Sequence, residues 1–348
     1  MKKQTKQMPQ LVSIQEISEE TGLEESLLRF YESEYPSELP DKILQGDMLA
    51  FDVCAIEAFQ RIHDLHQGEQ LEPTAGEGRY ARVIAVTSGK GGVGKTNIAL
   101  NLAIEMQRFG KMCIVLDADM GMANVHLLAG IPAGNNIRDI ISSGRDIVDI
   151  IAEGPEGIGI IPGGGGILSL ADSSRHDRMK VIDALRTVEK EAEVIIVDTG
   201  AGMGSSVRDF LACADDLLFV LSPDITSLAD AYGLLKALHH EKMSERPVYS
   251  VINMVETLKQ AAGVAHRFSS CAHEFLGRNV ENIGYILKDS TVAAATVRRT
   301  PYSVFKPQAR VSKNTRNIAA ALLKNEESTI RVSSAFGRYM NLLRAQKM

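Results

Sequence analysis

The sequence predicts an α/β fold, a doubly wound and mostly parallel sheet preceded by a small all-α unit. Near-continuous runs of Val, Ile and Leu recur between residues 83 and 255, as expected for strands buried on both faces of a parallel sheet. Segments of helical length and periodicity separate these runs, which indicates repeated βα units. A glycine-rich loop joins the first run to the first helical pattern. The 348 residues suit one large domain of this kind with a small companion.

Each expected element of the larger domain follows from its residues. Apolar runs predict strands over 83–88, 112–119, 157–162, 193–200, 216–223 and 247–255. Helical patterns lie between them, over 95–109, 175–190, 226–242 and 257–276, and Gly110 ends the first. Ligands in such folds bind at the carboxyl ends of the strands, so the residues after each strand are the candidates for a site.

The chain is expected to divide into five parts. Residues 71–81 hold Pro and two Gly between two patterned regions and indicate a linker. The predicted parts are a basic N-terminal tail (1–10), a helical domain (11–70), the linker (71–81), the α/β domain (82–327) and a basic amphipathic C-terminal helix (328–348).

Charge is distributed unevenly along this chain, although the formal total is only −6. Residues 11–70 hold fourteen acidic and three basic side chains, whereas residues 290–348 hold eleven basic and two acidic ones. The composition is otherwise that of an ordinary globular protein, which excludes collagen, disulfide scaffolds and general disorder. The four cysteines form no CxxC pair, and no secretory signal or membrane span is recognisable. These features predict a cytoplasmic protein with free thiols.

The segment SGKGGVGKT (88–96) contains the P-loop pattern, Gly89-x4-Gly94-Lys95-Thr96. Glycines let backbone N–H groups close around phosphates, and the following helix N-terminus adds partial positive charge. Lys95 is expected to reach the β- and γ-phosphates, and the Thr96 hydroxyl to ligate Mg²⁺. The alternative is a glycine-rich structural turn. The placement of the motif between a strand and a helix favours phosphate binding.

Carboxylates follow two of the predicted strands. Asp117 and Asp119 come at the end of 112–119, and Asp198 ends the apolar run of 193–200. An acidic residue at a strand end beside a P-loop is well placed to hold Mg²⁺ through water. These residues could instead serve only as turn formers or exposed strand ends.

Lys90 gives the loop a second lysine, and GKGGVGKT therefore resembles the deviant Walker A motif of the MinD/ParA family of dimerising ATPases. Residues 117–124 and 198–202 resemble the switch I and switch II segments of that family. The resemblance implies that Lys90 reaches the partner's phosphates in a nucleotide-sandwich dimer, that Asp119 positions the attacking water, and that Asp117 supports the metal. The expected catalytic residues are Lys90, Lys95, Asp117 and Asp119. The expected metal ligands are Thr96, Asp117 and Asp198. The expected contacts to ATP are Gly89, Gly91, Gly92, Val93, Gly94, Lys95, Thr96, Asn97 and Asn253.

Within the family the chain resembles the FlhG branch, MinD-like ATPases of flagellar site and number control. The similarity is carried by 120–130, 197–204, 222–238, 253–255 and 275–298, within residues 82–325, and departs at His126 and Leu228. It implies an ATP-dependent homodimer, partner-stimulated hydrolysis, and a partner such as a flagellar assembly factor or an FlhF-like GTPase. Partition ATPases of the ParA type and nucleotide-gated DNA-binding regulators are the alternatives. A metallocluster carrier is not favoured, because the cysteines lack the required pairing.

Asn253 ends the last predicted strand and matches the position that reads adenine in this family. With Glu256 it forms Asn-x-x-Glu, which lacks the lysine of the guanine-reading Asn-Lys-x-Asp signature, so ATP is expected rather than GTP. Asn253 could equally be a turn former at the strand end.

The C-terminal helix carries Val332, Phe336, Tyr339, Met340 and Leu343 at helical spacing, with basic residues mostly off that stripe. A basic amphipathic helix is typical of a peripheral membrane anchor, and family members commonly carry one. The expectation is contact with the inner face of the cell membrane. The alternative is a helix docked on its own domain.

Residues 11–68 resemble the helix-turn-helix domain of MerR-type regulators. DNA binding needs phosphate neutralisation, but this segment is strongly acidic and places Glu24 and Glu25 at the start of the expected recognition helix. Protein contact is therefore favoured over DNA binding for this unit.

Overall fold

The computed structural model describes most of the larger domain. Its described ranges are 80–119, 123–132, 134–164, 175–240, 246–324 and 334–345, with residues 11–23, 43–45, 48–52 and a few further positions up to 60 nearer the N-terminus. The chain divides into two units, Met1–Glu77 and Gly78–Met348. The division falls within the expected linker. The predicted N-terminal tail, most of that linker and Val332 lie outside the described residues.

An eight-stranded sheet forms the centre of the larger unit, in the order β11-β10-β9-β4-β8-β5-β7-β6. Neighbouring strands are parallel except β6, which runs antiparallel to β7. The strands are β4 (Arg82–Thr87), β5 (Cys113–Ala118), β6 (Ala152–Glu153), β7 (Gly159–Ile161), β8 (Val194–Thr199), β9 (Asp216–Leu221), β10 (Val248–Val255) and β11 (Glu281–Leu287). Every residue of β4, β5, β8 and β9 is buried, as the apolar runs predict.

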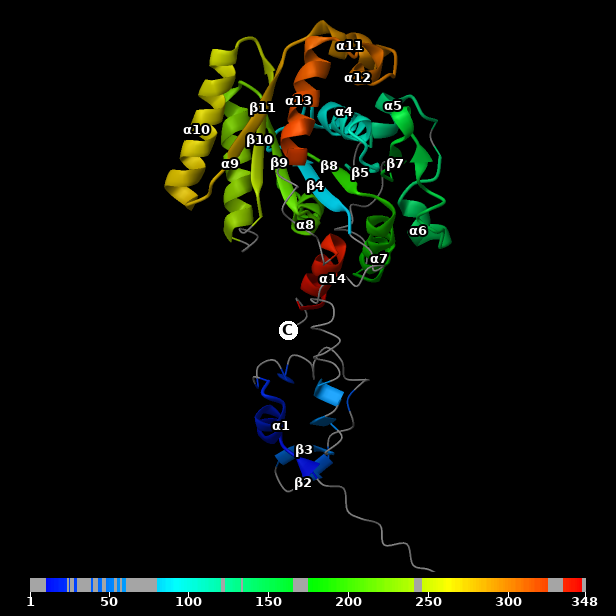
Figure 1. The fold of residues 1–348 in the computed structure, drawn as a ribbon, viewed down its shortest axis with the longest axis vertical. Helices are drawn as coiled ribbons and strands as arrows, with labels where there is room; N and C mark the ends of the chain where they lie inside the picture. Colours follow the sequence, from blue (N-terminus) through cyan, green and yellow to red (C-terminus); the bar gives the residue numbers. More distant parts are fainter. Residues whose placement is uncertain are drawn as a thin grey trace, which may run out of the picture. The chain divides into compact units, whose positions relative to one another are not determined.

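Helices cover both faces of this sheet (Figure 1). One core cluster joins the sheet to α6 (Arg138–Ser143), α7 (Arg175–Glu191), α8 (Ser205–Cys213), α9 (Ile225–His240), α10 (Leu258–Leu276) and α14 (Ala335–Ala345). The other joins it to α4 (Lys95–Arg108), α5 (Val125–Ala129), α11 (Ser290–Val297), α12 (Tyr302–Phe305) and α13 (Arg310–Lys324). A single 3-10 turn, η1 (Pro155–Gly157), precedes β7 in the described chain. This is the doubly wound arrangement that the sequence predicts.

The six predicted strands and four predicted helices are present, with ends that differ by a few residues. The edge strand β11 was not predicted, because its sequence mixes Glu281, Asn282 and Gly284 with apolar residues. An edge strand has only one neighbour in its sheet, so it lacks the continuous apolar signal of central strands. The parallel order places the carboxyl ends of β4, β5, β8, β9 and β10 along one edge of the sheet.

Helix α14 packs against α7 and α8. Phe336, Tyr339 and Met340 are buried in the core, with at most 5% of their surface exposed. The backbone N–H of Ala335 and the hydroxyl of Ser334 donate to the Glu189 carboxylate at the end of α7. The membrane-anchor interpretation is therefore not what the structure displays: three residues of the apolar stripe are covered by the chain's own domain, because its core supplies an apolar surface for them.

Replacing Phe336 by Ala is expected to lower the free energy of unfolding of the larger unit by about 3–5 kcal/mol, because its ring is fully buried. Denaturant unfolding followed by circular dichroism measures this change. Phe275→Ala is the matched control, since that ring is 69% exposed, and its expected cost is below about 1 kcal/mol. Equal losses in the two variants would contradict the docking of α14.

The N-terminal unit is not all-helical as expected. Strands β1 (Leu11–Val12), β2 (Ile43–Gln45) and β3 (Met48–Asp52) form an antiparallel sheet in the order β1-β3-β2. Gln45 of β2 pairs with Met48 of β3, and the sequence between them is Gly46-Asp47. Glycine followed by aspartate between two apolar runs is a hairpin signal, which the all-helical prediction did not take into account. Helix α1 (Ile14–Thr21) begins with a capping box between Ser13 and Glu16.

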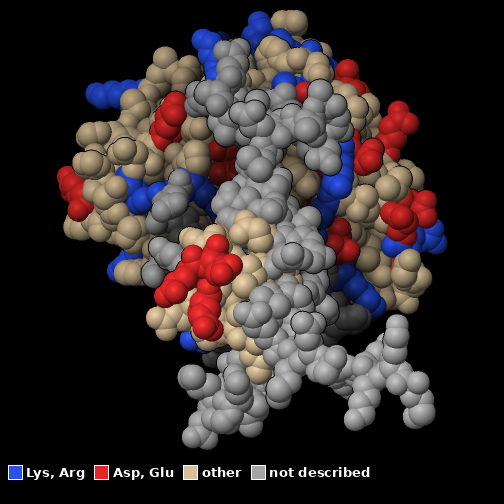
Figure 2. All heavy atoms as spheres, turned by 60° about the horizontal axis from the view of Figure 1, so that its bottom comes forward, with Lys and Arg blue, Asp and Glu red and all other residues tan. Residues whose placement is uncertain are grey.

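The described surface of this unit is acidic. Glu16, Glu19 and Glu20 of α1 are exposed, and Figure 2 shows red carboxylates gathered on it. This acidic surface opposes phosphate binding, and contact with protein stays a prediction for this unit.

Candidate functional site

The P-loop joins β4 to α4 with the backbone that its glycines permit. Gly92 and Gly94 have φ of 78° and 93°, in the left-handed region that favours glycine. A Cβ on Gly89 would lie 2.1 Å from the carbonyl carbon of Asp230, so this glycine allows α9 to lie against the loop. Helix α4 begins at Lys95 without a side-chain cap, which leaves its first N–H groups for an anion.

Lys95 is held under the loop. It is 8% exposed, and its Nζ donates to Ser88 Oγ at 3.0 Å, while Ser88 Oγ donates to the carbonyl of Lys90. Burial lowers the pKa of Lys95, and the carboxylates of Asp198 and Asp119 partly oppose this. A desolvated ammonium group in this position would attract phosphate oxygens strongly.

Two buried carboxylates lie side by side below the loop, because Asp117 in β5 and Asp198 in β8 are register partners. Asp117 accepts from the N–H groups of Asp119 and Val125, and burial raises its pKa to about 7. Burial and the charge of Asp117 raise the pKa of Asp198, while the Thr96 hydroxyl, which donates to it, opposes that shift.

These groups fit a magnesium ion. One oxygen of Asp198, Oδ1, is buried without a hydrogen-bond partner in the described structure. A hard cation supplies what such an oxygen lacks, and a bound cation would favour the charged forms of both carboxylates. The described residues hold no cluster of three or more His, Cys, Asp or Glu side chains that could bind a metal alone. The ion would therefore share Thr96, Asp198 and Asp117 with phosphate oxygens and water.

The two switch segments meet at the same edge. A Cβ built on Gly200 would lie 3.7 Å from Asp119 Oδ1, so the residue after β8 approaches the carboxylate after β5. The N–H of Gly202 donates to the carbonyl of Ser88, which holds the second segment against the P-loop. Asp119 therefore lies near the phosphate-binding loop, within reach of a water positioned there.

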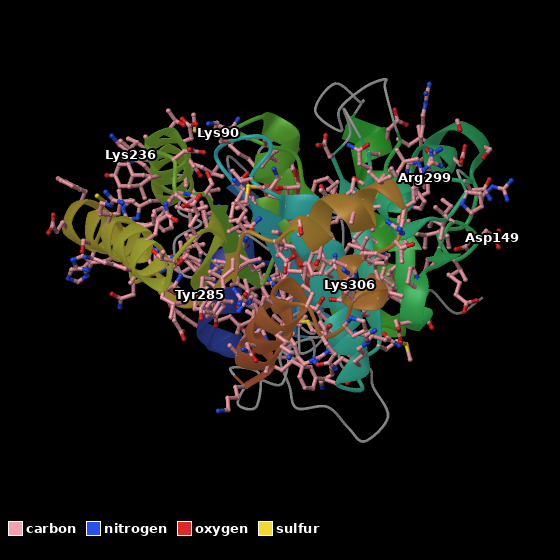
Figure 3. The ribbon with its side chains drawn as sticks, turned by 90° about the horizontal axis from the view of Figure 1, so that it is seen from above. Lys90, Asp149, Lys236, Tyr285, Arg299 and Lys306 are labelled. Atoms are coloured by element: carbon pink, nitrogen blue, oxygen red, sulfur yellow. The ribbon has the colours of Figure 1, made fainter. Side chains whose placement is uncertain are left out.

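Lys90 and Lys95 face different surroundings. Lys90 is half-buried in the loop after the carboxyl end of β4, and Figure 3 labels it in the view from above. Its Nζ donates to Thr226 Oγ1 in α9 at 3.0 Å. Its partner is thus a neutral hydroxyl of its own chain. Thr226 and Ser88 are contacts that sequence reasoning missed. Ser88 directly precedes the first glycine, whereas nothing local marks Thr226.

Asn253 lies two residues before the end of β10 and reaches the P-loop, with Nδ2 donating to the Val93 carbonyl at 2.8 Å. The structure thus brings residues from β4, β5, β8 and β10 to one site. Of the predicted contacts, Gly91 lies near Ala201, and Asn97 follows Thr96 in the first turn of α4.

Known proteins are similar to this chain in sequence and fold. A family model described as an AAA domain matches residues 81–248. The antiactivator FleN of Pseudomonas aeruginosa is 33% identical over 233 residues, which cover 66% of this chain and 82% of FleN. An uncharacterised ATP-binding protein of Methanocaldococcus jannaschii is 32% identical over 270 residues, covering 74% of this chain and 98% of the relative. The chain belongs to the MinD/ParA family of P-loop ATPases.

Further MinD/ParA relatives and structures agree. The flagellum site-determining protein YlxH of Helicobacter pylori is 29% identical over 71% of this chain and 83% of its own. MinD of Pyrococcus horikoshii, solved as a complex with Mg-ADP, superposes with a TM-score of 0.59 at 20% identity, covering 71% of this chain and 98% of that one. A chain of the MinC:MinD complex of Aquifex aeolicus superposes with a TM-score of 0.58 at 22% identity, covering 72% of this chain and 99% of that one. At these identities the two structures establish the fold.

As a member of this family, the chain is an ATPase. Thr96, Asp198 and Asp117 would hold Mg²⁺, which when bound neutralises charge on the β- and γ-phosphates. The P-loop N–H groups and Lys95 can hold the same phosphates, and Asp119 lies beside Gly200 at the same ends of the strands. Phosphoryl transfer requires mainly that the reacting groups be positioned and that the charge of the transition state be stabilised. The residues at this site include groups of both types.

Proposed function

We propose that the chain is an ATP-driven dimer switch that controls where, or how many, flagella are assembled. The observation that carries the switch is the contrast between the two lysines. Lys95 lies with the buried carboxylates of its own site, whereas Lys90 contacts the neutral Thr226 hydroxyl at the molecular edge. Among the described residues, the partner of the Lys90 ammonium group is this neutral hydroxyl, which it can exchange for the phosphates of a second molecule.

In this proposal, ATP joins two copies through their P-loop edges, and hydrolysis separates them. Lys95 and the loop N–H groups bind the phosphates, Thr96 and Asp198 hold Mg²⁺, with Asp117 in support. Asp119 orients or deprotonates the attacking water, and the partner's Lys90 stabilises transition-state charge. Coupling turnover to dimer formation makes the complex, and not a chemical product, the output.

Lys90→Ala is expected to lower ATP hydrolysis by about 10²–10³-fold, the effect of removing one charge-stabilising group. The affinity of the monomer for ADP should stay within about threefold, because Lys90 contacts α9 rather than its own phosphate site. Phosphate release and titration with a fluorescent ADP measure the two effects. Lys236→Ala removes an exposed lysine of α9, labelled in Figure 3, and should change neither. Loss of ADP binding in Lys90→Ala would contradict the assignment.

The flagellar role is supported by the names of two relatives, an antiactivator and a flagellum site-determining protein. Cells in which the native gene is replaced by the Asp119→Ala variant should build flagella in altered number or position. Electron microscopy of single cells measures both. Unaltered flagella combined with a defect in chromosome or plasmid inheritance would favour the partition alternative. The protein partner we propose is a flagellar assembly factor or an FlhF-like GTPase.

Peripheral membrane contact is part of this proposal only if α14 leaves the core, because its apolar stripe is covered. No helix within the described ranges is long and apolar enough to cross a bilayer. Co-sedimentation with anionic liposomes, in ATP and in ADP, tests this contact. ATP-dependent binding that disappears on truncation after Glu327 would support it, and equal sedimentation of both proteins would oppose it.

A further inference from the structure

Asn253 makes two hydrogen bonds at the end of β10, and both are internal. Its Nδ2 donates to the Val93 carbonyl of the P-loop at 2.8 Å, and its Oδ1 accepts from the Met254 backbone N–H at 2.9 Å. The side chain is only 7% exposed. An adenine-reading amide would need to present its donor and acceptor to the base, whereas this amide is largely committed to the protein.

The neighbouring backbone is shaped around this amide. A Cβ on Gly94 would lie 2.4 Å from Asn253 Nδ2, so a side chain there would displace the amide. Met254 adopts a φ of 58°, an uncommon conformation for a non-glycine residue, and its N–H is the one that Asn253 Oδ1 accepts. Strained conformations persist where surrounding contacts over-determine them. The amide thus fixes both the loop on one side and its own strand end on the other.

Val93 immediately precedes Gly94 and Lys95. The C=O and N–H of one planar trans peptide point in opposite directions. When Asn253 holds the Val93 carbonyl, it therefore directs the Gly94 N–H to the other side, away from β10. P-loops bind phosphates through such N–H groups.

We propose that Asn253 is a positioning residue for phosphate binding: it sets the Val93–Gly94 peptide plane and couples β10 to the P-loop. This proposal rests on the proposed function only because it requires that the P-loop binds phosphates. One Nδ2 hydrogen and one Oδ1 lone pair remain, but the side chain is buried and both of its groups are turned to the protein. In this proposal Asn253 therefore acts on the phosphates, which ATP and GTP share, and does not select ATP over GTP.

The test compares ATP, GTP and inorganic tripolyphosphate, which has no base, by isothermal titration calorimetry on the full chain. Asn253→Ala should weaken all three by about tenfold, the effect of losing one hydrogen bond of roughly 1.4 kcal/mol, with the ATP-to-GTP ratio unchanged within about threefold. Asn253→Asp should bind still more weakly, because a carboxylate oxygen would face the Val93 carbonyl. The side chain introduced by Asn253→Asp would keep an oxygen that accepts from the Met254 N–H but would lose the donor to the Val93 carbonyl. This variant therefore separates the contact with the P-loop from the contact with the strand end.

Asn282→Ala is the matched control, since that amide joins β11 to β10 at Ser250 and does not touch the P-loop. It should bind all three ligands as the native chain does. Melting temperatures separate misfolding from lost positioning, and Asn253→Asp serves where Asn253→Ala does not fold. Unchanged tripolyphosphate affinity in the Asn253 variants would overturn the proposal, whether or not the preference for ATP disappears. Failure of the native chain to bind any of the ligands would instead count against its ATPase function.

Discussion

Lys95→Ala is expected to reduce affinity for ATP and ADP by about 10²–10³-fold. A buried ammonium group that meets phosphate charge in a water-poor site contributes more than an exposed one, and its removal also takes away a cation that attracts the carboxylates of Asp198 and Asp119. Titration with a fluorescent ADP analogue measures the loss directly. ATP-dependent dimer formation should disappear with it.

Lys236→Ala serves as the control for this variant as well, because it removes a lysine from the surface of α9. Circular dichroism should give a folded spectrum for both variants, since α4 and β4 retain their buried apolar contacts. Nucleotide affinity within threefold of the native value in folded Lys95→Ala would show that the phosphates bind elsewhere.

Asp119→Ala is expected to slow ATP hydrolysis by about 10²–10⁴-fold, the usual contribution of a group that positions or deprotonates a nucleophile. ATP affinity should change little, because in this proposal the P-loop N–H groups and Lys95 hold the phosphates, whereas Asp119 acts on the attacking water. Single-turnover hydrolysis separates the chemical step from binding.

Asp149→Ala provides a carboxylate control away from the site. Asp149 is exposed and follows α6, and Figure 3 labels it far from Lys90. This variant should hydrolyse ATP at the native rate. Native hydrolysis by Asp119→Ala would remove that carboxylate from the mechanism and would point to Asp117 or Asp198 as the group that orients water.

Most of the larger domain was predictable because its signals are local. The strands β4, β5, β8 and β9 are mostly apolar and buried throughout, and the P-loop pattern is nearly sufficient to place α4. Asp117 and Asp198 were predicted as separate strand ends. Their pairing across the sheet depends on the strand order, in which β8 lies between β4 and β5, and no local pattern encodes that order.

Contacts between residues distant in sequence could not be predicted. The apolar stripe of α14 fits a membrane and a protein core equally well, and its contacts with Glu189, α7 and α8 place it in the core of the structure. Asn253 has the residue type of a base-reading position, but its partner, Val93, lies 160 residues earlier. In the N-terminal unit, the Gly46-Asp47 hairpin signal was available but was outweighed by the helical resemblance.

We propose that ATP controls the assembly of two copies of this chain through their P-loop edges. The decisive measurement is light scattering coupled to size-exclusion chromatography of Asp119→Ala, because slow hydrolysis lets this variant keep its ATP. We expect a dimer in ATP with Mg²⁺, a monomer in ADP, and a monomer in both nucleotides when Lys90→Ala is added. A monomer in ATP under conditions where nucleotide binding is saturated would contradict the switch.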